Sequence, residues 1–221
     1  MKRQGLGASP HFRPPSDWRE FPSSDLSPIL RVALQEIVTH GYDATSVRVI
    51  AEGVGVTVPA LYYHFANKQA LLVALLDHAM DIVMEHLILA SSDAGDEPVL
   101  RFAHLVEAIA LYMANHRDLA FLDSERRSLK PENLNRYADR RDDVERLLRG
   151  AIVDGCSSGA FGTEDPDECG RAILSMCQGI ASWYRPDGPM TPGETASRYV
   201  QIALAAVECE PVARAKLTAP A

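Results

Sequence analysis

The strongest constraint on the fold is a pair of short helical patterns, residues 46–54 and 57–64, with almost no chain between them. Each holds apolar residues at the spacing of one helix face. Gly53 and Gly55 are expected to end the first helix, and Thr57 can cap the second. Two short helices joined by a tight, glycine-containing turn are typical of a helix-turn-helix.

The second of these helices carries side chains that do not all fit a core. Pro59 lies in its first turn, where the missing N–H is tolerated. Leu61 and Phe65 can anchor the helix to its own domain. Tyr62 and Tyr63 are adjacent, so they cannot both face one core, and at least one of them must be exposed.

These side chains suit contact with DNA. Small residues at the start of the helix allow close approach to base edges, and long side chains with polar tips can reach phosphate oxygens. The candidates for base contact are Thr57, Val58 and Pro59, and those for phosphate contact are Tyr62, Tyr63 and His64. Arg48 and Lys68 would add positive charge on either side. The alternative is packing for the tyrosines and an ordinary surface position for His64 and Lys68.

The rest of the chain also has helical periodicity, and no strand-like alternation competes with it. Ser27 followed by Pro28 begins a helix that Gly41 stops, and Asn67 caps a much longer one. Five further helices are expected, over residues 97–115, 119–128, 131–155, 166–184 and 192–208. The fold class is therefore all-α, with an N-terminal three-helix DNA-binding domain and a C-terminal helical domain.

We divide the chain into three parts. Residues 1–24 are rich in proline and are expected to form a flexible arm. The alternative is that its aromatic residues, Phe12, Trp18 and Phe21, dock on the body. Residues 25–70 form the helix-turn-helix domain. Residues 71–221 form the helical effector-binding and dimerisation domain.

Charge distribution, cysteine spacing and the motifs that are missing exclude several classes of function. The net charge is −8, but residues 1–69 hold seven basic and six acidic residues, so the acidic excess lies in the remainder. The four cysteines form no CxxC pair, and no apolar stretch is long enough to span a bilayer, which favours a cytoplasmic protein without membrane contact. No catalytic, cofactor-binding or zinc-binding motif is present, so we expect neither enzyme activity, nor a cofactor, nor a metal.

The stretch "TSVRVIAEGVGVTVPALYYHFANKQALLVALL" resembles the DNA-binding domain of TetR-type transcriptional repressors, and the similarity extends from about Ile29 to Leu76. The resemblance implies that Thr45 or Ser46 contacts DNA, together with Arg48, Thr57, Pro59, Tyr62, His64 and Lys68. Many members have glycine where Pro59 stands, so the base preference at this position stays open.

The C-terminal segments "WYRPDG" and "HRDLAFLDSERRSL" look like those of TetR-type regulators that respond to acyl-CoA thioesters. This resemblance implies an effector pocket lined by Leu105, Ile109, Tyr112, Met113, Phe121, Met176 and Trp183. Arg126, or alternatively Arg127 or Arg185, would meet the charged end of the effector. The alternative is that these are core apolar residues and surface arginines.

The function that follows is sequence-specific DNA binding by a transcriptional regulator. The resemblance implies a repressor that binds a palindromic double-stranded operator as a homodimer and is released by a small apolar or acyl-CoA-like effector. Apolar helices at 166–184 and 195–208 are the expected dimer interface. The alternative is a helical ligand-binding or adaptor protein that does not bind DNA.

Overall fold

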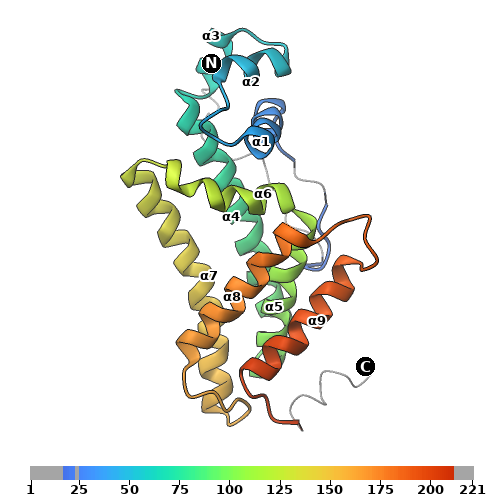
Figure 1. Cartoon of the computed structure of the whole chain (residues 1–221). Coiled ribbons are helices and arrows are strands. Elements are labelled where there is room, and N and C mark those ends of the chain that lie inside the picture. The colour runs from blue at the N-terminus through green and yellow to red at the C-terminus, as the bar shows by residue number, and fades with distance from the viewer. Residues whose placement is uncertain (1–16, 23–24, 212–221) are drawn as a thin grey trace, which may run out of the picture. The chain divides into compact units, whose positions relative to one another are not determined.

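The computed structural model describes residues 17–22 and 25–211, and these residues divide into two compact units (Figure 1). Unit 1 holds residues 25–82 and 118–139 of this part, and unit 2 holds residues 17–22, 83–117 and 140–211. The described residues are helical throughout except for their connections, and their one strand-like pairing is an isolated bridge between Phe161 and Cys209. The all-α prediction is confirmed.

Unit 1 begins with three short helices, α1 (Pro28–His40), α2 (Val47–Val54) and α3 (Val58–His64). The predicted caps are present. Ser27 accepts a hydrogen bond from the amide of Leu30, and Asn67 accepts one from the amide of Ala70, the third residue of α4 (Lys68–Asp93). The unit also holds α4 up to Ile82, α6 (Arg117–Phe121) from Asp118 on, the 3-10 helix η1 (Leu122–Ser128) and the start of α7 (Pro131–Ser157). The predicted helix over 119–128 is thus two elements, because the chain tightens to 3-10 pitch after Phe121.

Unit 2 contains the remaining parts of α4 and α7, with α5 (Pro98–Asn115), α8 (Pro166–Trp183) and α9 (Pro192–Ala206). Helix α5 packs against α8 and α9, and eleven of its eighteen residues are buried. Its core includes Phe102, which meets Phe161 edge to face with ring centroids 5.2 Å apart. No helix of the described residues is long and apolar enough to cross a membrane.

The segment Asp17–Phe21 is part of this second unit. Trp18 is only 4% exposed, and its indole N–H donates to the Asp93 carboxylate at 3.0 Å. Phe21 stacks on the His86 ring with centroids 3.9 Å apart. For these residues the structure shows the docked alternative and not a flexible arm, while Phe12 lies outside the described residues.

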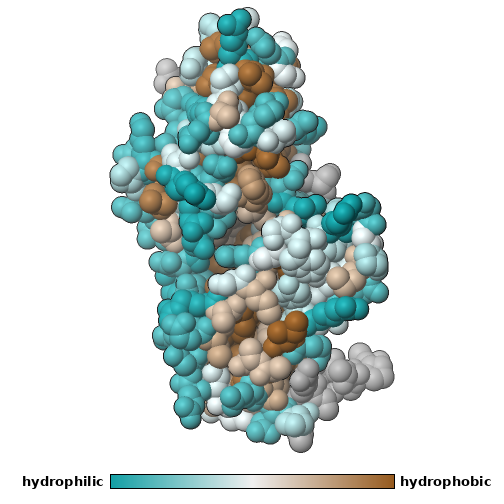
Figure 2. All heavy atoms as spheres, in the orientation of Figure 1, coloured by the Kyte–Doolittle hydropathy of each residue, from teal (hydrophilic) through white to brown (hydrophobic). Residues whose placement is uncertain are grey.

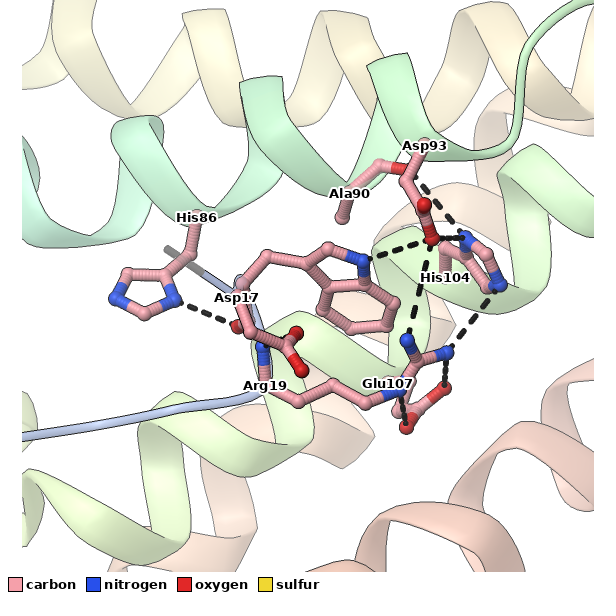
Figure 3. Close-up of polar contacts among 8 residues, drawn as sticks. Asp17, Arg19, His86, Ala90, Asp93, His104 and Glu107 are labelled. Carbon is pink, nitrogen blue, oxygen red and sulfur yellow. Dashed lines mark hydrogen bonds and ion pairs between the residues drawn. The ribbon is translucent and has the colours of Figure 1, made fainter. Parts of the chain in front are cut away.

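Two histidines hold this segment (Figure 3). The His86 Nδ1–H donates to the Trp18 carbonyl at 2.8 Å. Arg19 donates to Glu107 at 2.9 Å and approaches His104 Nε2 at 3.4 Å. Because a guanidinium can only donate, His104 Nε2 is the acceptor and its Nδ1 carries the proton, which faces the Ala90 carbonyl.

Burial lowers the pKa of both imidazoles. For His86 the hydrogen bond to Trp18 and the charge of Glu85 act against this shift. For His104 the Arg19 guanidinium lowers the pKa further, while the Ala90 carbonyl and the Glu107 and Asp93 carboxylates oppose it. The docked segment is therefore held by neutral histidines.

Candidate DNA-binding surface

The turn between α2 and α3 is built by local hydrogen bonds. Ser46 caps α2 by accepting from the amide of Val49, so of the two predicted caps it is Ser46 that acts. Gly55 ends the helix in the left-handed conformation, with φ of +79°. Thr57 then caps α3 by accepting from the amide of Ala60 at 3.3 Å.

Gly53 has a different role from the predicted helix stop. It lies inside the last turn of α2, and a Cβ at this position would come within 2.8 Å of the Val32 side chain of α1. Gly53 therefore permits close packing of α2 on α1, and Gly55 alone ends the helix.

Helix α3 has one buried anchor and several exposed polar side chains. Leu61 is fully buried, as expected, and Phe65 is half-buried just after the helix. Tyr62 is 47% exposed and Tyr63 is 75% exposed, so neither tyrosine is a core residue. The candidate contact residues exposed on or beside α2 and α3 are Ser46, Arg48, Thr57, Pro59, Tyr62, Tyr63 and His64, and Val58 is half-buried.

Arg48 is the exposed cation of this surface. Its side chain is 82% exposed and lies 3.1 Å from Glu52, one turn further along α2. Such an exposed pair adds little stability. The guanidinium can therefore leave Glu52 for a phosphate oxygen at little expense.

Thr45 and Lys68 are placed differently from the other candidates. Thr45 is only 4% exposed, and its hydroxyl donates to the Gly41 carbonyl at 2.9 Å. The Lys68 ammonium donates to the carbonyls of Tyr42, Asp43 and Thr45 at 2.8, 3.3 and 3.0 Å. Both side chains thus bond to the turn that joins α1 to α2. Lys68 reaches it from 23 to 26 residues further along the chain, so local sequence spacing does not reveal this contact.

Tyr42 completes this turn. Its ring is buried, and the Lys68 Nζ lies 4.2 Å from the ring centroid, within range of a cation–π contact. Burial and the neighbouring Asp43 charge raise the pKa of Tyr42, while a hydrogen bond with Gln69 lowers it. The phenol therefore stays neutral beside the ammonium.

The predicted effector residues fall into two groups. Leu105, Ile109 and Tyr112 are buried in α5, with Met113 beside them and Met176 on α8 half-buried in the same unit. Trp183 is 42% exposed at the end of α8. Phe121 and Arg126 belong to unit 1, where Phe121 is 42% exposed and Arg126 pairs with Asp123 at 2.7 Å.

Among the described residues, no group of three or more histidine, cysteine or acidic side chains is arranged to hold a metal ion. What α2 and α3 offer is a protruding set of hydroxyl, phenol, imidazole and guanidinium groups on two short helices. This arrangement defines a helix-turn-helix DNA-binding protein.

Comparison with known proteins gives the family. Residues 29–75 match the family described as bacterial regulatory proteins, tetR family, and residues 95–207 match the tetracyclin repressor-like C-terminal domain. The second match spans more than half of the chain, which therefore belongs to the TetR family of DNA-binding transcriptional regulators. This is a family of non-enzymatic proteins.

Three relatives illustrate the similarity. The chain is 25% identical over 186 residues to the HTH-type transcriptional repressor KstR2 of Mycobacterium tuberculosis strain H37Rv, covering 83% of this chain and 93% of the relative. A solved tetR-family regulatory protein from Rhodococcus RHA1 has a TM-score of 0.76 at 28% identity, covering 83% and 96%. AibR in complex with isovaleryl coenzyme A and operator DNA has a TM-score of 0.72 at 26% identity, covering 79% and 95%.

Proposed function

We propose that this regulator is a repressor that binds a palindromic operator as a homodimer and is released by an apolar or acyl-CoA-like effector. The observation that carries the proposal is the exposed set of α2 and α3 side chains on a TetR-family chain. Two findings support the finer parts of it. KstR2 relatives are named repressors, and AibR is a structural neighbour whose complex holds isovaleryl coenzyme A and operator DNA.

For DNA contact we propose Ser46, Arg48, Thr57, Val58, Pro59, Tyr62, Tyr63 and His64. Arg48→Met should weaken binding on all sequences and lower the log-log salt slope by about one, because one phosphate contact is lost. Glu52→Gln is the matched opposite change. It frees Arg48 from its partner and removes a negative charge near phosphate, so affinity should rise.

For the dimer we propose the exposed face of α8 and α9. Brown, apolar surface lies over α8 and toward α9 (Figure 2), and Ile202 of α9 is 51% exposed. Trp183 of α8 and Tyr199 of α9 stack on one another with an interplanar angle of 23° and ring centroids 6.2 Å apart. The buried residues Ile173, Cys177 and Ile180 of α8 belong to the core of the chain itself, so a partner would meet the other side of this helix.

Sedimentation equilibrium tests the dimer. Ile202→Asp places a charge in the proposed interface and should give a monomer that no longer binds two half-sites together. Ile88→Asp is the control, since Ile88 is 54% exposed on α4 of the same unit. A wild-type monomer, or equal effects of the two substitutions, would contradict this interface.

For the effector we propose that Leu105, Ile109, Tyr112, Met113 and Met176 in unit 2 surround its apolar part. Helix α4 contributes residues to both units, so a shift of α4 on effector binding could be passed to the helix-turn-helix through the chain itself. Such coupling between two sites typically changes affinity by about 5- to 150-fold.

The decisive experiment selects a duplex from a random library and measures its binding by fluorescence anisotropy. Isovaleryl-CoA is then added, with free coenzyme A as the control that lacks the acyl chain. Release by the thioester alone would support the proposed effector class. Absence of salt-sensitive duplex binding would instead favour the adaptor alternative. Binding that neither compound changes would refute the acyl-CoA part only.

A further inference from the structure

The turn before α2 brings several backbone carbonyls to one place. It runs from Gly41, whose φ is +83°, to Ser46, the cap of α2. The amide of Thr45 bonds back to the carbonyls of both Gly41 and Tyr42 at 3.2 Å. The carbonyls of Tyr42, Asp43 and Thr45 then converge on one point, where they need a donor.

Lys68 is that donor. An ammonium has three N–H groups and no acceptor, and here three carbonyls lie within hydrogen-bond distance of Nζ. The Tyr42 ring covers the same ammonium at 4.2 Å. All N–H groups of Lys68 therefore have partners inside the protein, and none is left for a phosphate.

The hydrogen bond from Lys68 to Thr45 lies just before the start of α2. Thr45, whose carbonyl Lys68 binds, directly precedes Ser46, and Ser46 accepts from the amide of Val49 to start α2. Fixing the Thr45 carbonyl fixes the direction in which the chain enters α2. Helix α3 follows after only three residues, so the orientation of both helices depends on this entry.

We propose that Lys68 is a positioning residue for the helix-turn-helix: it holds the turn at residues 42–45 by a tripod of hydrogen bonds and does not itself contact a phosphate. This inference rests on the proposed DNA binding for its functional meaning. The sequence predicts that Lys68 contacts DNA directly. Under this proposal Lys68 acts on DNA binding only indirectly, through the turn. Thr45, buried and bonded to Gly41, belongs to the same support.

The first test needs no DNA. Lys68→Met keeps an unbranched side chain but removes the donor. Hydrogen exchange of the Thr45, Val49 and Ile50 amides, which bond within the turn and the first turn of α2, should accelerate by roughly tenfold. Arg48→Met is the matched control, because Arg48 is a cation on α2 whose side chain, within the described part of the chain, bonds to Glu52 and not to the turn. It should leave these amides unchanged.

The second test measures duplex affinity as a function of salt. Lys68→Met should weaken binding by a similar factor at every salt concentration with an unchanged log-log slope, whereas Arg48→Met should lower the slope by about one. A slope that falls by about one for Lys68→Met, with unchanged exchange, would overturn the proposal and restore a phosphate contact.

The two tests separate failure of this proposal from failure of the proposed function. If the wild-type chain binds no duplex, the DNA-binding proposal fails, while the exchange rates still decide whether Lys68 holds the turn. If Lys68→Met does not fold, Lys68→Arg replaces it. The planar guanidinium keeps the charge but cannot point three donors at one cluster of carbonyls, so exchange should still rise. Unchanged exchange in Lys68→Arg would refute the tripod.

Discussion

Two irregular segments of this chain are each held by a helix side chain that donates hydrogen bonds to their backbone carbonyls, an ammonium in one case and an imidazole in the other. The turn before α2 is held by the Lys68 ammonium, which binds three carbonyls. The segment Asp17–Phe21, a few residues before α1, is held by His86 on the Trp18 carbonyl and by His104 beside Arg19. An ammonium stays charged over the pH range in which an imidazole gains its proton.

The difference predicts how each segment responds to its surroundings. An ammonium has no lone pair for acid to protonate, so acid should leave the contact of the turn intact. The histidines of unit 2 donate through Nδ1 while they are neutral, and protonating His104 at Nε2 would set a cation against the Arg19 guanidinium. One segment is fixed by a constant charge and the other by groups that must stay uncharged.

The largest expected effect comes from removing the anchor of the histidine-held segment. Trp18→Ala deletes a side chain that is 4% exposed and packs in the core of unit 2, so unfolding of this unit should become easier by about 3–5 kcal/mol. Urea denaturation followed by circular dichroism measures this loss. The exchange of the Thr45 amide in unit 1 should not change.

Two controls sharpen this prediction. Ile88→Ala, at a position 54% exposed in the same unit, should change stability by less than about 0.5 kcal/mol. Cys177 is fully buried, and burial raises its pKa to about 12, so a thiol reagent reaches it only when unit 2 opens. Its labelling should accelerate in Trp18→Ala. Equal losses in Trp18→Ala and Ile88→Ala would show that Trp18 contributes no core packing.

A smaller effect should follow from acid. Burial lowers the pKa of His86 and His104 below 6.5, so their contribution is complete above that pH and is lost as the pH falls. The loss is at most about 1.4 kcal/mol per pH unit for each histidine. In a Trp183→Phe background the remaining tryptophan is Trp18, and its emission should shift to the red between pH 7 and 5.

The readout must be local, because unit 1 also contains a buried histidine, His78, whose pKa burial lowers. Trp18 emission reports the docked segment, whereas circular dichroism reports the helices of both units. We expect the emission change to begin at higher pH than the loss of helix. If the two signals change together, acid unfolds the chain as a whole and the histidines do not act on this segment separately.

The smallest effect should come from Arg19→Ala. Arg19 is 42% exposed in its side chain, so losing its pairs with Glu107 and Asp93 should change stability by no more than about 1 kcal/mol. The guanidinium lowers the pKa of His104, however, and removing it should raise that pKa toward the ordinary value. Proton NMR titration of the His104 ring checks this, and a downward movement would contradict the assigned role of Arg19.

Sequence spacing predicted those parts of the structure that depend on neighbours along the chain. Ser27, Ser46 and Thr57 bond amides three residues ahead, so a cap and its helix can be seen together in the sequence. The adjacency of Tyr62 and Tyr63 required at least one of them to be exposed, and the structure exposes both. The helix-turn-helix pattern linked these short helices to DNA, and the family resemblance added which residues contact it.

The missed contacts are those that join distant parts of the chain. Lys68 and Tyr42 are 26 residues apart, and Trp18 and Asp93 are 75 residues apart. In the sequence, Lys68 therefore cannot be told from any other lysine at the start of a helix. Trp18 likewise cannot be told from any aromatic residue in a proline-rich tail. Gly53 was expected to end a helix. Its real role, close approach to the Val32 side chain, depends on tertiary packing and is not visible in the local sequence.

The docked position of Trp18 bears on how such regulators can be recombined. The family match to the DNA-binding domain begins at residue 29, and a chimera that imported a foreign N-terminus together with that domain would lose Trp18. The hybrid would retain every helix of unit 2 and still lack a piece of its interior. A domain exchange should therefore keep residues 17–22 with the C-terminal domain and place its first junction after Pro22.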